Sequence, residues 1–143
     1  MPKGAQITLV WMGALAENSK KQFLFLKIPA GSPWRPGQWC LPGGKIEWGE
    51  KPEETVAREI FEETGSRLLT RPKLVDVYTS LERKRGNTYH MILVIYKAKV
   101  KDRIRLSDEH DDFKWLALED SLKLKLIPDL RLAIKRRISE SAL

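Results

Sequence analysis

The chain has 143 residues, of which 42% are hydrophobic, and a formal net charge of +7 from 26 Lys and Arg against 19 Asp and Glu. This length suits one domain over residues 1–143, and no apolar run reaches the roughly 18 residues of a membrane span. The lone Cys40 cannot form an internal disulfide, and the N-terminus lacks the apolar core of a signal peptide, so a cytoplasmic protein is expected. The positive charge favours anionic ligands such as phosphates, nucleotides or nucleic acid, although many basic proteins bind none of these.

Alternating apolar and polar residues predict strands along most of the chain. A segment rich in Pro and Gly at 30–44 is expected to be mostly loop, and the basic stretch 83–87 should join two long strands. The expected strands are 6–15, 22–28, 39–41, 73–82, 88–99 and 112–118.

Two helical segments are expected among these strands. The first covers 52–64, where a proline suits the first turn, acidic residues suit the N-terminal end of the helix dipole, and Gly65 suits the stop. The second begins near Glu119, is interrupted by Pro128 and resumes to about Ile138. Helices and strands in this mixed order predict a layered α/β or α+β fold.

Three carboxylates gather on one face of the first expected helix. At 100° per residue, Glu59, Glu62 and Glu63 fall within an arc of about 100°. Like charges at this spacing repel by a few tenths of a kcal/mol per pair, and only Arg58 flanks them closely. A divalent cation such as Mg²⁺ or Mn²⁺ would relieve the repulsion, whereas a solvated helix face is the alternative. The residues expected to pack on a sheet lie roughly opposite: Ala57, Ile60, Phe61 and Thr64.

The spacing of glycines and charges around this helix resembles the signature of the Nudix hydrolases. That signature is a glycine, then a glutamate, then an Arg-Glu-x-x-Glu-Glu-x-Gly segment, at fixed intervals. It usually ends in an aliphatic residue, for which this chain has Ser66, and we expect a small effect on stability without loss of chemistry. The preceding segment PGQWCLPGG is also similar to the family. The matching positions are Gly44, Glu50, Arg58, Glu59, Glu62, Glu63 and Gly65.

The resemblance implies an α/β/α sandwich around a mixed sheet, in which the signature forms a loop–helix–loop metal site. It also implies hydrolysis of a diphosphate linked to another group, with Mg²⁺ as the cofactor and Mn²⁺ as its substitute. The metal would neutralise the diphosphate oxygens and lower the pKa of an attacking water. Arg58 would orient one of the carboxylates. The implied metal ligands are Glu59, Glu62, Glu63 and the carbonyl of Gly43, with Glu50 close by.

In this family a general base often comes from a loop late in the chain. The stretch 107–115 is the acidic, histidine-bearing loop of this sequence, and counting back from Trp115 places Glu109 on the family's loop glutamate. His110 matches a histidine found there in GDP-mannose hydrolases. The catalytic candidates are therefore Glu109, His110 and a signature glutamate such as Glu62, while ordinary solvated loop residues are the alternative for the first two.

Tryptophans around the signature are candidates for stacking a nucleobase. Trp39 falls in a short strand and is expected in the core, whereas Trp48 is the better exposed candidate. Arg35, beside Trp34, is a candidate for contacting a substrate phosphate.

Within the family, a MutT-like pyrophosphohydrolase of nucleoside triphosphates is favoured, because the chain is short, a compact loop is expected before the final strand, and no extra domain is expected. A nucleotide-sugar hydrolase acting on GDP-mannose or ADP-ribose is the alternative. His110 favours GDP-mannose, but those relatives usually have a degraded signature, and positions 79–82 lack the proline of ADP-ribose hydrolases.

A non-enzymatic module that binds nucleotides or RNA through the basic C-terminal helix is a further alternative. The intact glutamates argue against it. The sequence leaves open whether the protein forms a homodimer. Many members of the family dimerise, but no long apolar seam is readable in this chain.

Overall fold

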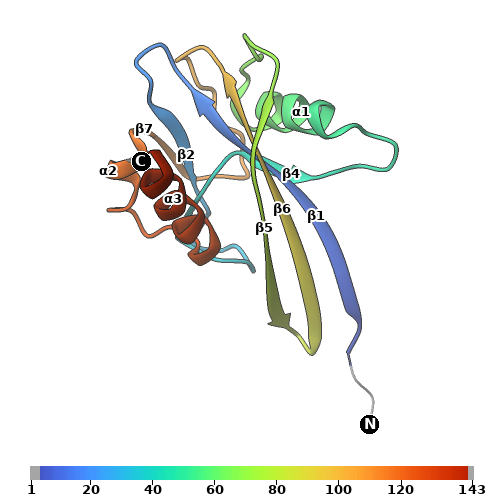
Figure 1. Ribbon diagram of the computed structural model, residues 1–143. Helices are drawn as coiled ribbons and strands as arrows, with labels where there is room; N and C mark the ends of the chain where they lie inside the picture. The colour runs from blue at the N-terminus through green and yellow to red at the C-terminus, as the bar shows by residue number, and fades with distance from the viewer. Residues whose placement is uncertain (1–3, 142–143) are drawn as a thin grey trace.

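A curved mixed sheet forms the centre of the computed structural model, which describes residues 4–141 (Figure 1). Its strands follow the order β3-β2-β1-β6-β5, while β4 pairs with β1 and β7 pairs with β2. β1 and β6 run parallel, from Gln6 opposite Thr88 to Glu17 opposite Lys99, and the other pairs are antiparallel. The strands are β1 (Gln6–Glu17), β2 (Phe23–Lys27), β3 (Trp39–Cys40), β4 (Gly43–Lys45), β5 (Lys73–Lys84), β6 (Asn87–Lys99) and β7 (Asp112–Leu116).

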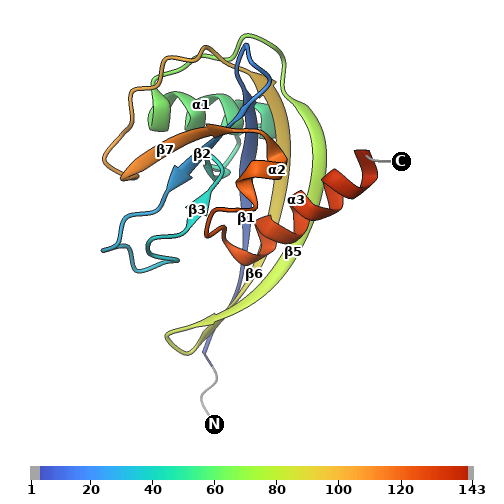
Figure 2. The same cartoon turned by 90° about the vertical axis from the view of Figure 1, so that its left-hand side faces the viewer.

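Helices cover both sides of this sheet. α1 (Pro52–Thr64) lies against β1 and β4, whereas α3 (Pro128–Ser141) lies against β5 on the other side (Figures 1 and 2). The short α2 (Leu118–Ser121) connects β7 to the segment before α3. The predicted α/β fold class with a mixed sheet between helices is confirmed.

α1 has the boundaries that the sequence predicts. At its start, the backbone N–H of Lys51 donates to Glu54 Oε1 at 3.0 Å, which satisfies a donor that the first turn leaves free. At its end, Gly65 adopts a φ of 72° and its N–H donates to the carbonyl of Phe61 at 2.9 Å. This left-handed stop is the conformation for which glycine carries no Cβ penalty.

The buried face of α1 differs from the expected one. Ala57 and Phe61 were predicted to pack on the sheet, but both are exposed, and the guanidinium of Arg67 lies over the Phe61 ring instead. Glu63 was predicted on the open face, but it is only 2% exposed. α1 is therefore rotated about its axis relative to the expected orientation. The cause lies in β4, where the backbone N–H of Gly43 donates to the Glu63 carboxylate. The residues that α1 buries are Thr55, Val56, Ile60, Glu63 and Thr64.

Three further predictions need correction. β4 (Gly43–Lys45) lies in a segment that we expected to be loop. Pro128 does not interrupt a helix but begins α3, where its fixed φ and missing N–H are suited to the first turn. The basic loop predicted at 83–87 shrinks to Arg85-Gly86, with φ values of 51° and 78°, the paired positive values of a tight two-residue hairpin turn.

The core lies between the sheet and its covering helices. Trp39 is 7% exposed, which confirms its predicted place in the core. Within residues 4–141, no helix combines the length and the apolar character that crossing a bilayer requires. The most buried large side chains of the core include Met12, Leu24, Phe25, Leu26, Val56 and Ile60.

Candidate active site

A pocket of about 570 Å³ opens on the concave side of the sheet, within the size range of small-molecule sites. Its walls come from β1, β5 and β6, from the loop between β2 and β3, and from the residues that begin α3. One part of the lining is acidic, with Glu59 and Glu63 from α1 and Glu109 from the loop before β7. Another part is aromatic, with Trp11 and Trp34. Both parts belong to one cavity.

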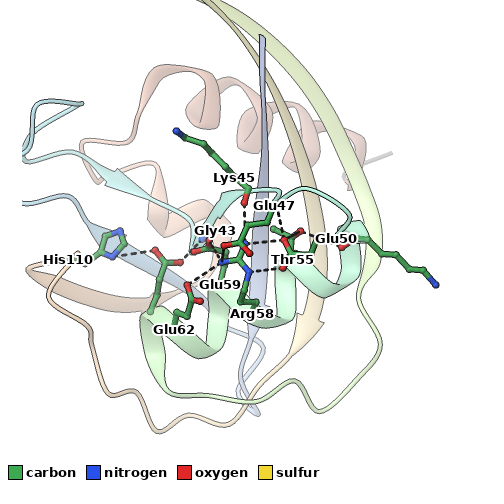
Figure 3. A network of polar contacts seen from close by, with 11 residues as sticks. Gly43, Lys45, Glu47, Glu50, Thr55, Arg58, Glu59, Glu62 and His110 are labelled. Atoms are coloured by element: carbon green, nitrogen blue, oxygen red, sulfur yellow. Dashed lines mark hydrogen bonds and ion pairs between the residues drawn. The ribbon is translucent and has the colours of Figure 1, made fainter. Parts of the chain in front are cut away.

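Arg58 connects carboxylates of α1 with those of the loop before it (Figure 3). Its Nη1 donates to Glu59 Oε1 at 2.8 Å and to Glu62 Oε2 at 3.2 Å, and it lies 3.6 Å from Glu47 Oε1. Its Nη2 also donates to the carbonyl of Lys45 at 3.2 Å. Arg58 therefore relieves part of the repulsion that the sequence predicted between Glu59 and Glu62.

Glu50 is fully engaged by donors from the protein. Arg58 Nε donates to its Oε2 at 2.6 Å, and Thr55 Oγ1 and the N–H of Glu47 donate to its Oε1 at 2.6 Å and 3.0 Å. These hydrogen bonds, that from Arg58 first, lower the pKa of Glu50 to about 2. Glu50 thus fixes Arg58, which in turn fixes Glu59. Its carboxylate is not among the pocket-lining groups that the described residues provide.

Glu63 is a buried carboxylate at the floor of the acidic part. The backbone N–H of Gly43 donates to its Oε1 at 2.7 Å. Glycine is needed at 43 because a Cβ there would clash with the backbone carbonyl of Met12, whereas a Cβ at Gly44 would displace the Glu59 carboxylate. Burial nevertheless raises the pKa of Glu63 to about 9, with added repulsion from Glu59, Glu109 and Glu62.

The loop before β7 is anchored beside Glu63. The N–H of Ser107 donates to the carbonyl of Glu63 at 3.0 Å, and the N–H of Asp111 donates to that of Lys27 at 3.0 Å. This places His110 Nδ1 3.5 Å from Glu63 Oε2, beyond good hydrogen-bond geometry, and its Nε2 3.8 Å from Cys40 Sγ. Burial lowers the pKa of His110, so the ring is neutral near pH 7.

These groups are suited to a divalent cation. Donor atoms of Glu63, Glu109 and His110 all lie within 4.8 Å of one another, and Glu59 borders the same part of the pocket. Burial also raises the pKa of Glu59, against the opposing effect of Arg58. Buried carboxylates whose charge is only partly matched, next to an exposed one, are the oxygen-rich donor set that hard cations prefer. The arrangement therefore fits a metal centre.

The remaining predicted residues lie in different places. Glu62 has a side chain that is 54% exposed and contacts Arg58, outside the pocket lining formed by residues 4–141. Trp48 is fully exposed and also lies outside that lining. Arg35 does line the pocket, but its guanidinium forms an ion pair with Glu82 of β5.

Several pocket residues were not predicted from the sequence. Trp11 and Glu82 lie in strands whose alternation predicts burial but not which face meets a cavity. Tyr78 and Asp129 also line the pocket, and burial raises the pKa of Tyr78. Their signal in the sequence is weak, because each reaches the pocket only through the packing or pairing of its element with segments far away along the chain.

Ser66, the departure from the signature, has a local explanation. Its side chain is buried and its Oγ donates to the carbonyl of Arg103 at 3.0 Å, while its N–H donates to Thr64 Oγ1 at 3.2 Å. A serine here ties the end of α1 to the segment that leads towards Glu109. The hydroxyl replaces apolar packing with a hydrogen bond.

Comparison with known proteins gives consistent matches. The NUDIX domain family profile matches residues 9–136. Nucleoside triphosphatase NudI from Escherichia coli O139:H28 is 35% identical over 94 residues, which cover 59% of this chain and 65% of that protein. NudI from Klebsiella pneumoniae is 34% identical over 115 residues, which cover 74% of this chain and 79% of that protein.

Solved structures of MutT proteins superpose on most of the chain. The MutT protein from Methanosarcina mazei Go1 has a TM-score of 0.77 at 29% identity, covering 95% of this chain and 96% of its own. A MutT NUDIX hydrolase from Burkholderia pseudomallei has a TM-score of 0.74 at 32% identity, covering 90% and 96%. Together with the signature on α1 and the fold around it, these matches show that the chain belongs to the Nudix family and is MutT-like.

Proposed function

We propose that this chain is a pyrophosphohydrolase of nucleoside triphosphates that depends on a divalent metal, Mg²⁺ by preference. The observation that carries the proposal is the buried Glu63, which lies with Glu59 and Glu109 in a pocket that also has an aromatic part. The names of the relatives agree with it, since NudI is a nucleoside triphosphatase. That match spans 65% of the NudI chain, so the substrate is transferred only as a proposal.

In this proposal the carboxylates of Glu59 and Glu63 hold the metal together with the Gly43 carbonyl. Glu62, whose exposed side chain contacts Arg58 outside the pocket lining, would turn towards the metal to complete the set. When bound, the metal would neutralise phosphate oxygens and make a water more acidic. Glu63 is kept in place by the Gly43 N–H. Glu59 is held by Arg58, which Glu50 orients, so Glu50 supports the metal site indirectly.

Glu109 is the proposed general base. It borders the acidic part of the pocket from an exposed loop, so its carboxylate can reach a water near Glu63 and carry a proton back to solvent. His110 is enclosed between Glu63 and Cys40. We therefore assign His110 a secondary role, as a neutral ring that lines the acidic part beside Glu63.

The experiment is a panel of nucleoside triphosphates, nucleotide sugars and 5′-triphosphorylated RNA, incubated in ¹⁸O water with Mg²⁺ and after its removal by chelation. The proposal predicts that a nucleoside triphosphate yields a nucleotide and pyrophosphate, only with metal, and the label reports which phosphorus was attacked. Faster turnover of GDP-mannose or ADP-ribose would favour the nucleotide-sugar alternative. RNA binding without hydrolysis of any substrate would favour the non-enzymatic module. Cytoplasmic location and self-association stay predictions of the sequence.

A further inference from the structure

The loop between β2 and β3 is fastened to β5 by a single carboxylate. Glu82 Oε2 accepts a hydrogen bond from Trp34 Nε1 at 3.3 Å, and Glu82 Oε1 forms an ion pair with the guanidinium of Arg35. Both charged side chains are largely buried, with exposed fractions of 29% for Arg35 and 21% for Glu82. One acidic residue on the sheet therefore holds two consecutive residues of a loop that walls the pocket.

The fastened loop presents an aromatic wall to the pocket. The rings of Trp34 and Trp11 lie 5.9 Å apart between centroids, with planes inclined by 27°. Ser32 Oγ accepts from the N–H of Trp34 at 3.1 Å and donates to its carbonyl at 2.9 Å, which shapes the loop from within. Both tryptophans border the cavity that contains the acidic part.

Arg35 has a backbone conformation that indicates a constraint. Its φ is 46°, in the left-handed region that is uncommon for a residue with a side chain. Such a conformation persists when the surroundings over-determine it. The ion pair with Glu82 holds the side chain of this residue, and it also engages the charge that the sequence had suggested for a phosphate.

We infer that Glu82 is a positioning residue that holds Trp34 against Trp11, so that the two rings form a wall for the planar base of a nucleotide. Flat aromatic faces bind bases by stacking, whatever the base. Arg35 then acts through the loop rather than on phosphate. This inference rests on the proposed function, because it assigns the base of the proposed nucleotide substrate to the aromatic part of the same pocket.

The kinetic test compares Glu82→Ala with Glu82→Gln and with Arg83→Ala, which changes the next, exposed residue of β5. KM is measured for nucleoside triphosphates, and inorganic tripolyphosphate, which has the same anhydride bonds and no base, is measured as a competitive inhibitor. We expect Glu82→Ala to raise KM about tenfold, which corresponds to the loss of one charged hydrogen-bonding group. The tripolyphosphate inhibition constant and kcat should stay unchanged, as should every constant of Arg83→Ala.

Glu82→Gln keeps an acceptor for Trp34 and loses the ion pair, so its KM should lie between wild type and Glu82→Ala. An equal rise in KM and in the tripolyphosphate constant would place Glu82 at the phosphates and overturn the inference. An unchanged KM in Glu82→Ala would overturn it as well.

A spectroscopic test separates this inference from the proposed function. Two stacked indoles give an exciton couplet in circular dichroism, and Trp34→Phe identifies the part of the signal that comes from the pair with Trp11. The couplet should be lost in Glu82→Ala and kept in Arg83→Ala. A retained couplet in Glu82→Ala would contradict the positioning role. If no nucleotide in the panel is cleaved, the proposed function fails, and the couplet still decides whether Glu82 positions the wall.

Discussion

The two parts of the pocket handle charge in opposite ways. In the aromatic part, the Glu82 carboxylate is matched by Arg35 and by the indole N–H of Trp34. In the acidic part, burial raises the pKa of Glu63 to about 9; the Gly43 N–H donates to this carboxyl, while the neutral His110 ring lies 3.5 Å away, beyond good hydrogen-bond geometry. The protein therefore balances the charge of Glu82 with its own groups, but it balances that of Glu63 only in part.

This difference separates a structural carboxylate from a functional one. Where the protein itself balances a buried charge, the charge holds neighbouring groups in position. Where it does not, the fold bears an electrostatic cost that a bound cation can offset. We therefore propose that a bound cation balances the acidic part, whereas contacts within the protein hold the aromatic part in place.

Of the variants that test this contrast between the two parts of the pocket, Glu63→Gln should have the largest effect on kcat. The amide can still accept from the Gly43 N–H, but it removes the negative charge that the cation needs, so kcat should fall on the order of a thousandfold. Steady-state hydrolysis of the best nucleotide in the panel measures this. Glu53→Gln, on the same helix and outside the pocket lining of the described residues, is the matched control and should keep wild-type turnover. Wild-type turnover in Glu63→Gln would refute the assignment of Glu63.

Glu109→Gln should have the next largest effect. Loss of a general base lowers kcat by roughly 10²–10⁴-fold and should change the shape of the pH–rate profile. Thermal stability should change little, because the side chain is exposed. Glu119→Gln, another exposed acid, serves as the control. A reduced rate with an unaltered profile would move the base to another residue, His110 first.

Glu50→Gln removes a carboxylate whose charge the protein balances, and which lies next to the less well balanced carboxyls of the acidic part. It weakens the hold on Arg58 and so lets Glu59 move, which for a residue supporting a metal ligand costs roughly 10–100-fold in metal affinity or activity. Higher Mg²⁺ concentration should recover part of the rate. Titrating the rate against Mg²⁺ checks this, and a loss that excess metal leaves untouched would show that Glu50 acts in some other way.

Much of the fold could be predicted because its signals are local. The boundaries of α1 follow from a proline, an acidic first turn and Gly65, all within the helix or next to it. β4 was missed because three residues between prolines and glycines have no readable period, and it becomes a strand only by pairing with β1. The predicted orientation of α1 was wrong for the same reason, since the Gly43 N–H draws the Glu63 side chain inward.

Candidate ligands for the site could be predicted from the sequence, but the contacts that connect them could not. Fixed spacing identified the glutamates, and the family pattern pointed to the loop with Glu109, which the fold places in the same pocket. The contacts of His110 with Cys40 and of Arg35 with Glu82 join residues separated by 70 and 47 positions. Such pairs depend on how the sheet is assembled, and no periodicity within the chain reports them.

The most direct test of whether Glu63 holds the metal is calorimetric titration of Mg²⁺ into the metal-free protein. Wild type, Glu63→Gln and Glu53→Gln are compared. Wild type and Glu53→Gln should bind Mg²⁺ and gain thermal stability from it, while Glu63→Gln should do neither. Affinity should increase from pH 6 towards pH 9, because the raised pKa of Glu63 means that a proton must leave before the metal binds. Equal Mg²⁺ affinity in wild type and Glu63→Gln would contradict the claim that this buried carboxylate holds the metal.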